Sequence, residues 1–506
     1  MEWPLRKESL DNFWKRLEAD ARDSESGSRF PILSRPLVHV TLLVVLALTF
    51  SLGGLAANKT LEGDEALYAL VPKTIVMTGE WTHLTYNGEP YLFKPPLNFW
   101  ISAVFFHVLP MSAFTAALGS ALFGAFSALM IYLLCRAMFP GWELAFCSTL
   151  VYLTTHEVLH WTRGVHLETV LTFWILVGLL AVYVSVKRPA AVLGLGVAAG
   201  LGWLAKGPQS LFPGAVALLL WKSEGIAWRR IVSFWSIASG IVLIIILAPW
   251  LLSRLQEGSG FAQGYFGKEL RHTLFGPTQL RNGPLFYPVK LAATYWPWLP
   301  AALLGFFLLG RGWRRSVGAR LWLLYAGVVI LVIMLTAEKR MRYLFQLYPA
   351  LSVAAGAAVT FAAQRYPRLL RLFVILTMVG ATVMIVVGRK GRPPAPATRD
   401  ALVAVGRLEP GERVWITDRT QHGGKSLPSV AKSLGFYAQP LLSACKNECR
   451  EEATGGSTVV TRADEAEEVA TIVKGKVDYS NKTLALIKIP NPGPKGESNH
   501  ENRTRP

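Results

Sequence analysis

Two polar stretches of the chain, GDEALY at residues 63–68 and NGEPYLFKPPL at residues 87–97, interrupt a largely apolar sequence. The first follows a long apolar run at residues 38–57, and a new apolar run begins at the end of the second. Carboxylates at such a position often mark only the first turn of a helix, where they offset the helix dipole. The sequence around the two stretches decides between that role and a functional loop.

The composition is that of an integral membrane protein. Hydrophobic residues make up 52% of the 506 residues and charged residues only 17%, which is too apolar for water-soluble domains alone. A membrane-crossing helix needs about 20 apolar residues. We therefore predict a mainly α-helical, polytopic bundle of about eleven spans, at residues 38–57, 112–135, 143–162, 169–186, 189–205, 207–221, 231–250, 286–309, 320–337, 344–363 and 372–388.

The basic residues indicate how the bundle is oriented, because short loops rich in Lys and Arg stay in the cytoplasm. The basic N-terminal tail and the loops at 136, 187–188, 222–230, 311–320 and 365–371 then share the cytoplasmic side of the inner, or plasma, membrane. An odd number of spans places the C-terminal part on the extracytoplasmic side. The cluster Arg389, Lys390 and Arg392 lies on that side against the rule.

Four regions follow from this pattern. Residues 1–37 form a cytoplasmic tail, and residues 38–388 form the membrane domain, whose first external loop is 58–111. Residues 389–490 alternate β-rich runs with a helix-like segment, which predicts a small extracytoplasmic α/β domain. Cys445 and Cys449 can pair there as a disulfide. The Pro-, Gly- and Asn-rich end, 491–506, is expected to be disordered.

The formal net charge of +19 has its main explanation in the membrane. Much of it lies in the predicted cytoplasmic loops, where it sets the topology and attracts anionic membrane lipids. The sequence contains no nucleic-acid-binding motif, so we expect no nucleic-acid partner.

The first-loop string resembles a known signature, D-E-A-x-Y, then N-G-x-P-Y, then K-P-P-L. This signature belongs to the lipid A 4-amino-4-deoxy-L-arabinose transferase and protein O-mannosyltransferase-like family of the GT-C superfamily of membrane glycosyltransferases. The resemblance extends to about residue 350. Further matches are Arg163 with Glu168, GWLAKGP at 202–208, the Pro-Trp pairs at 249–250 and 297–298, and KRMRY at 339–343 followed by Pro349.

The resemblance implies the reaction and its residues. A hexose or pentose would move, with inversion, from a polyprenyl-phosphate-linked donor to lipid A, another glycolipid or a glycan on the extracytoplasmic face. No cofactor would be required, with a divalent metal left open. The catalytic carboxylates would be Asp64 and Glu168. Substrate binding would involve Glu65, Tyr68, Tyr91, Lys94, His160, Arg163, Lys206, Lys339, Arg342 and Tyr343.

Physical chemistry supports these roles independently. Cleavage of a sugar–phosphate bond builds negative charge on the phosphate, which Lys and Arg stabilise in a low-dielectric site. A carboxylate such as Asp64 can accept the acceptor's proton or steady an oxocarbenium ion. Charges near hydrocarbon are costly, which favours functional roles over decorative ones. For Lys339 and Arg342, an interfacial anchor is an equally open interpretation.

Three positions depart from the family pattern. Leu67 stands where many relatives have arginine, Phe93 where they have glutamate, and Glu168 where aspartate is usual. The first two changes remove a charge pair beside the donor. They bear on the identity of the sugar and of the acceptor more than on the reaction type.

A different motif, HEVLHWTRGVH at residues 156–166, suggests a zinc metalloprotease. His156 and His160 would bind the metal, Glu157 would activate water, and His166 has the spacing of a third ligand. The longer protease motif requires glycine where this chain has Arg163, so the match is imperfect. On one continuous helix, His156, His160 and Arg163 would instead form a polar face lining the donor cavity.

A third class is a lipid-linked-sugar flippase or transporter. Transporters are typically built from internal repeats and carry broken helices near the middle of the membrane. Here the charged residues gather at one face of the membrane, which favours the transferase.

Overall fold

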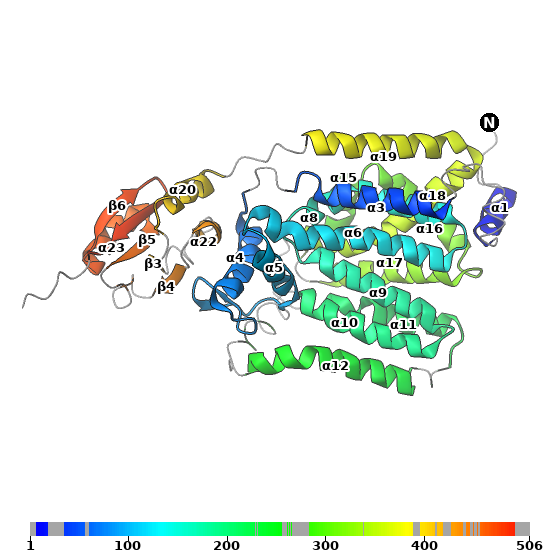
Figure 1. The fold of residues 1–506 in the computed structure, drawn as a ribbon. Helices are drawn as coiled ribbons and strands as arrows, with labels where there is room; N and C mark the ends of the chain where they lie inside the picture. Colours follow the sequence, from blue (N-terminus) through cyan, green and yellow to red (C-terminus); the bar gives the residue numbers. More distant parts are fainter. Residues whose placement is uncertain are drawn as a thin grey trace, which may run out of the picture. The chain divides into compact units, whose positions relative to one another are not determined.

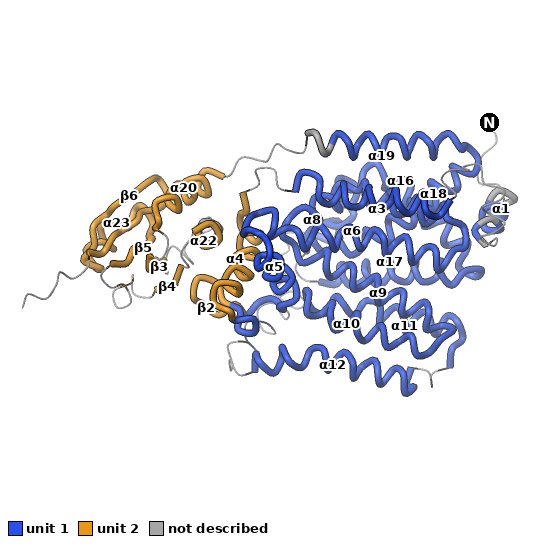
Figure 2. The backbone as a smooth tube through the Cα atoms, in the orientation of Figure 1, with its two compact units in different colours: residues 1–59, 80–84, 92–392 blue, residues 60–79, 85–91, 393–506 orange. Residues whose placement is uncertain are grey.

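The computed structural model describes residues 7–18, 35–55, 60–227, 229, 231–255, 261, 263, 265, 283–336, 339–387, 395–409, 412–417, 427–438, 442–445, 449, 453 and 456–490. The chain forms two compact units, which Figure 2 distinguishes by colour. Unit 1 contains residues 1–59, 80–84 and 92–392, and unit 2 contains residues 60–79, 85–91 and 393–506. The predicted disordered tail 491–506 and the cluster at 389–392 lie outside the described residues.

Unit 1 is a bundle of helices, most of them apolar (Figure 1). Its α-helices are α1 (Lys7–Glu18), α3 (Pro36–Leu52), α5 (Leu97–Val108), α6 (Ala113–Met138), α7 (Trp142–Thr154), α8 (His156–Thr162), α9 (Glu168–Ser185), α10 (Leu193–Lys206), α11 (Phe212–Ser223), α12 (Phe234–Leu255), α15 (Phe286–Thr294), α16 (Trp298–Arg311), α17 (Val317–Leu335), α18 (Tyr348–Arg365) and α19 (Pro367–Val387). Short 3-10 turns, η1 (Pro189–Val192), η2 (Pro208–Leu211) and η5 (Met341–Leu347), precede α10, α11 and α18.

The prediction of a polytopic helical bundle is confirmed. Every predicted span coincides with at least one helix. Among the described residues, six helices are long and apolar enough to cross a membrane, and a seventh crossing results if α15 and α16, which meet at 114°, form one span. Helices such as α7 and α11 are shorter than the about 20 residues that a crossing needs. The count of about eleven spans therefore stays a prediction.

Small residues allow the central helices of the bundle to approach closely. Helix α18 is rich in Ala, and most of its side chains are buried. A Cβ at Gly305 of α16 would collide with the Ala354 carbonyl, and one at Gly356 would collide with Ser148 of α7. Close packing of this kind is the main source of helix association in membranes, where lipid is as apolar as the helix surface.

The predicted continuous helix over 143–162 is wrong. Helix α7 ends at Thr154, Thr155 is extended (φ −74°, ψ 120°), and α8 begins at His156. Both threonine hydroxyls donate hydrogen bonds back to α7, Thr154 to the Leu150 carbonyl (2.7 Å) and Thr155 to the Val151 carbonyl (2.8 Å). Such back-bonding weakens and bends helices. The HEVLH residues thus occupy a short helix of their own.

Unit 2 is an α/β module, as predicted for the C-terminal region. Besides α4 (Gly63–Thr78) and the small hairpin β1 (Thr85–Tyr86) and β2 (Glu89–Pro90), it contains α20 (Pro396–Val405), β3 (Arg413–Thr417), α22 (Leu427–Tyr437), β4 (Leu442–Cys445), β5 (Ser457–Arg462), η7 (Ala463–Glu465), α23 (Ala466–Val473), β6 (Lys476–Ser480) and β7 (Leu484–Lys488). The sheet order is β4-β3-β5-β7-β6. Strand β3 is parallel to β4 and β5, whereas β7 is antiparallel to β5 and β6.

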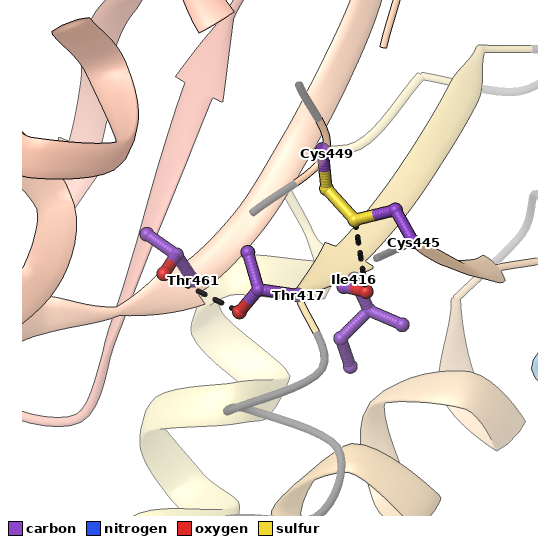
Figure 3. The surroundings of a disulfide bond; sticks show 5 residues. All are labelled: Ile416, Thr417, Cys445, Cys449 and Thr461. Carbon is purple, nitrogen blue, oxygen red and sulfur yellow. Dashed lines mark hydrogen bonds between the residues drawn. A yellow bond between two sulfur atoms is a disulfide. The ribbon is translucent and has the colours of Figure 1, made fainter. Parts of the chain in front are cut away.

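The predicted pairing of Cys445 with Cys449 is confirmed. The two residues form a disulfide at the end of β4 (Figure 3). The Cys445 sulfur lies 3.3 Å from the Ile416 carbonyl oxygen of β3, and the Thr417 hydroxyl is 3.4 Å from that of Thr461. The disulfide therefore links the end of β4 to the segment that follows it.

Candidate active site

A buried ion pair joins two of the predicted site residues in unit 1. The Lys206 ammonium lies 2.8 Å from a carboxylate oxygen of Glu168, and their side chains are only 8% and 3% exposed. Glu168 begins α9 and Lys206 ends α10, so each charge also opposes the dipole of its own helix end. Helix α10 stops at Gly207, whose φ of +111° requires glycine.

Further cations surround this pair. Arg342 and His166 interact electrostatically with Glu168, and Arg342 and Lys94 with Lys206. The Lys206 ammonium also lies 5.6 Å from the centre of the Tyr343 ring. We call this group the basic cluster: Lys94, Glu168, Lys206, Arg342 and Tyr343. It brings three permanent cations, Lys94, Lys206 and Arg342, close to one another, and Lys and Arg side chains are the usual ligands of phosphate groups.

Neutral side chains hold the basic cluster in place. Asn98, four residues after Lys94, donates from its side-chain amide to the Ala205 carbonyl (2.5 Å), which connects the start of α5 to the end of α10. The Thr172 hydroxyl of α9 donates to the side chain of Gln346 in η5 (2.7 Å), the turn that carries Arg342 and Tyr343. Asn98 and Gln346 are not among the predicted site residues, because no local sequence pattern distinguishes them from other polar residues.

Lys339 has a structural partner in addition to its predicted role. Its ammonium donates to the carbonyl oxygens of Met334 (3.0 Å) and Thr336 (3.2 Å), at the end of α17. It also lies 5.8 Å from the centre of the Tyr287 ring. A lysine that bonds the last carbonyls of a helix stabilises that helix end. A helix cap is therefore a third possible role for Lys339, besides substrate binding and anchoring at the membrane interface.

Arg163 also bonds to a helix end. Its guanidinium donates to the carbonyl oxygens of Phe50 (3.0 Å) and Gly53, at the end of α3. Arg163 itself follows the last residue of α8. The expected helical face of His156, His160 and Arg163 is therefore broken, since Arg163 lies beyond α8 and contacts α3. A role for Arg163 in substrate binding stays a prediction.

The residues of the protease motif do not form a zinc site. The His156 side chain is 78% exposed and His160 is also exposed, whereas Glu157 is buried and accepts a hydrogen bond from the Trp161 indole (3.1 Å). The His166 ring packs against Trp161, with ring centres 4.5 Å apart. Within the described part of the chain, no group of three or more His, Cys, Asp or Glu residues could hold a metal. The structure gives the metalloprotease alternative no support.

The substitution Glu157→Gln distinguishes the protease hypothesis from the transferase hypothesis. In a zinc protease this change removes the residue that activates water and erases activity. In this structure a Gln carbonyl can still accept the Trp161 hydrogen bond, so we expect sugar transfer to keep most of its rate. A chelator should also leave transfer largely intact. Stoichiometric zinc, lost together with all activity in His156→Ala or His160→Ala, would contradict this expectation.

Unit 2 carries the remaining predicted site residues. Asp64 and Glu65 lie in the first turn of α4, and the Asp64 carboxylate is 55% exposed. The Lys432 ammonium of α22 lies 3.5 Å from it. Tyr68 and Tyr91 are buried, at 5% and 3% exposure. Lys432 is not among the predicted site residues, because a lone lysine in the soluble domain carries no sequence signal that it contacts the first loop.

A second lysine fixes α4 against α22. Lys73 of α4 is 3% exposed, and its ammonium donates to the carbonyls of Gly435 (2.9 Å), Phe436 (3.3 Å) and Ala438, at the end of α22. Burial lowers the pKa of Lys73 to about 8. The Leu61 backbone adds two bonds, from its N–H to the Tyr437 hydroxyl (2.8 Å) and from the Ser433 hydroxyl to its carbonyl (3.0 Å). Helix α22 therefore determines where Asp64 lies within unit 2.

The chain is similar to known membrane glycosyltransferases. Residues 93–252, which include Lys94, Glu168 and Lys206, match the family model of dolichyl-phosphate-mannose-protein mannosyltransferases. An undecaprenyl phosphate-α-4-amino-4-deoxy-L-arabinose arabinosyl transferase of Pseudomonas paraeruginosa is 28% identical over 253 residues, 47% of this chain and 45% of the relative. Another of Edwardsiella ictaluri is 24% identical over 331 residues, 63% of this chain and 58% of the relative. The chain thus spans about half the length of the curated relatives it matches.

Solved structures share the fold. A crystal structure of ArnT from Cupriavidus metallidurans bound to undecaprenyl phosphate superposes with a TM-score of 0.70 at 16% identity, over 90% of this chain and 98% of that one. The apo form gives 0.68 at 17% identity, over 88% and 97%. The resemblance found in the first-loop string is confirmed: the chain is similar to membrane glycosyltransferases in residues 93–252, and its fold is similar to that of ArnT from Cupriavidus metallidurans.

Proposed function

We propose that the chain is an integral membrane glycosyltransferase. It transfers a pentose or hexose from a polyprenyl-phosphate-linked donor to lipid A, another glycolipid or a glycan. The observation that carries the proposal is the basic cluster, which brings Lys94, Lys206 and Arg342 together near Glu168. The donor phosphate is the anion that these cations would bind. The similarity to arabinosyl transferases and to a structure bound to undecaprenyl phosphate supports the same ligand class.

The basic cluster suits the departure of a lipid phosphate. When the sugar–phosphate bond breaks, negative charge grows on the phosphate oxygens, and preorganised cations in a water-poor site stabilise it. Arg342 can offer a planar pair of N–H donors, whereas Lys94 and Lys206 act as point charges. Glu168 holds the Lys206 ammonium in position and compensates its charge before the donor arrives. Its proposed catalytic contribution is therefore to position Lys206.

Asp64 is proposed to act on the acceptor. Its exposed carboxylate takes the proton from the acceptor hydroxyl, and the hydroxyl oxygen forms a bond to the anomeric carbon of the sugar. The bond from that carbon to the phosphate oxygen breaks at the same time, and its electron pair leaves with the polyprenyl phosphate. A single displacement of this kind inverts the anomeric centre. Lys432 orients the carboxylate through the ion pair at 3.5 Å.

The reaction is proposed to take place on the extracytoplasmic face of the inner membrane. The disulfide between Cys445 and Cys449 supports an oxidising environment for unit 2, which also contains Asp64. The distribution of Lys and Arg among the loops supports the same orientation.

A reporter fused at the C-terminus tests this orientation. We expect an alkaline phosphatase fusion, which requires export, to be active, and a fluorescent protein that folds only in the cytoplasm to stay dark. The same pair of reporters fused after Arg188 should give the opposite pattern, since this loop is basic. A fluorescent C-terminal fusion together with an inactive phosphatase fusion would place unit 2 in the cytoplasm.

Lys94→Ala is expected to weaken donor binding and turnover together. Lys94 interacts electrostatically with Lys206, and two prolines stiffen the backbone that follows it. Losing one of three cations at a phosphate should reduce donor affinity about tenfold or more. Lys94→Arg should be partly tolerated because it keeps the charge. Titration of the purified variants with a fluorescent polyprenyl-phosphate sugar measures the affinity; an unchanged value in Lys94→Ala would show that the phosphate binds elsewhere.

The proposed function itself is tested by reconstitution. The purified protein in liposomes is incubated with a labelled polyprenyl-phosphate sugar and an extract of bacterial envelope lipids. A transferase moves the label to a new lipid or glycan, which mass spectrometry identifies. A flippase would carry the intact labelled donor across the bilayer without changing its mass, and that outcome would overturn the proposal.

A further inference from the structure

A cavity lies in unit 1 at the end of α9 that is far from the basic cluster. Glu168 of the basic cluster begins α9, whereas the cavity is lined by Val184, Val186 and Lys187 at the end of the same helix. Helix α9 has 18 residues, so its two ends lie about 27 Å apart. The end of α6 and the start of α17 complete the cavity, which has a volume of about 450 Å³. Since α6, α9 and α17 are candidate membrane spans, it lies where the bundle meets the membrane surface.

The lining of this cavity combines cations with hydrocarbon. Lys187, Arg188 and Arg315 are exposed cations, and the described lining residues include no carboxylate. The remaining walls are mostly apolar, with Trp14, Leu17 and Met138 among them. A site for free inorganic phosphate would require the cations but no apolar wall. A site that offers both surfaces side by side matches a molecule with an anionic head and an apolar chain.

The N-terminal helix α1 forms one wall. Its residues Leu10, Phe13, Trp14 and Leu17 are buried in the core of unit 1. The Asp11 carboxylate of α1 pairs with Arg315 at 2.7 Å and offsets the charge of that cation. Lys187 and Arg188 are the other two cations among the described lining residues.

Trp14 is the residue that anchors this wall. Its indole lies so close to Gly312 that a Cβ there would collide with the ring. The indole N–H is buried and has no hydrogen-bond acceptor among the described residues. The packing against Gly312 thus holds a large aromatic side chain in the wall of the cavity.

We propose that this cavity binds an anionic phospholipid. Lys187, Arg188 and Arg315 hold the phosphate of the head group, and an acyl chain runs along Trp14, Leu17 and Met138. Basic pockets between membrane helices are the usual sites for such lipids. The basic loops that set the topology would explain the cations but neither the cavity nor the aromatic wall. The inference does not depend on the proposed sugar transfer.

Native mass spectrometry of the full-length protein in detergent tests the proposal. We expect phosphatidylglycerol to bind and to raise the unfolding temperature, with phosphatidylcholine and inorganic phosphate much weaker. In the triple variant Lys187→Gln, Arg188→Gln, Arg315→Gln, the affinity for phosphatidylglycerol should fall about tenfold or more. The matched control removes three other basic side chains of the predicted cytoplasmic side, with Arg365→Gln, Arg368→Gln and Arg371→Gln, and should retain the affinity within about threefold.

A second variant, which keeps all three basic residues, tests the proposal even if the triple variant does not fold. Met138→Trp fills the cavity from its apolar side and should also reduce binding of phosphatidylglycerol. An equal loss of affinity for phosphatidylglycerol in the two triple variants would show that only the general surface charge matters, and would overturn the proposal. Equal binding of phosphatidylcholine, or equal stabilisation by inorganic phosphate alone, would overturn it as well, the first by removing head-group recognition and the second by removing the acyl chain.

Discussion

Asp64→Asn is expected to abolish sugar transfer while expression and thermal stability stay near those of the parent. Removal of a general base typically lowers a rate about 10²–10⁴-fold. The cost to folding should be small, because the Asp64 side chain is 55% exposed and its pair with Lys432 is at the surface. Exposed ion pairs contribute about 0–1 kcal/mol. Transfer of labelled sugar by the purified variant, next to its unfolding temperature, measures both quantities.

Two further variants make the Asp64 result specific. Glu80→Gln removes another carboxylate of the first loop, one that is 62% exposed and lies near His83, and should leave transfer unchanged. Lys432→Ala should reduce turnover more mildly than Asp64→Asn and leave donor affinity near that of the parent, because Lys432 only orients the carboxylate. Lys432→Arg should recover part of the rate. Substantial turnover in Asp64→Asn would remove this residue from catalysis.

Lys206→Met should have the second large effect, on both stability and donor binding. The substitution leaves the Glu168 carboxylate buried at 3% exposure without its ion-pair partner. Breaking a buried pair in this way costs about 3–5 kcal/mol of folding free energy. It also removes a cation from the proposed phosphate site. A drop in unfolding temperature, together with loss of binding of the labelled donor, is the expected result.

The double variant Lys206→Met, Glu168→Leu separates the two effects. Replacing both members of a buried pair by apolar residues of similar size is often neutral for stability. We expect the double variant to regain thermal stability but not donor binding, because Arg342 and Lys94 alone offer too few cations. Recovery of full transfer together with stability would show that the ion pair is only structural and that the donor phosphate binds elsewhere.

Much of the fold could be predicted from local patterns. Long apolar runs predict membrane helices whatever their neighbours are, since lipid requires every backbone group to bond within its own helix. The β-rich runs after residue 389 predicted the small α/β module, and the sheet confirms it. Local patterns did not reveal where helices break. The apolar run 143–162 looks continuous, and only the structure shows that α7 ends at Thr154, with Thr155 extended before α8 begins.

The candidate site, too, could be predicted only in part from the sequence. The first-loop string by itself determined the kinds of residue involved, because D-E-A-x-Y and K-P-P-L combine carboxylate, lysine and proline at a membrane boundary. Only the tertiary structure decided their partners: Lys206 for Glu168, Lys432 for Asp64, and the end of α22 for Lys73. It also showed that Arg163 and Lys339 bond to helix ends. Helix periodicity relates residues a few positions apart, whereas an ion pair depends on which helices pack together, and that depends on the whole chain.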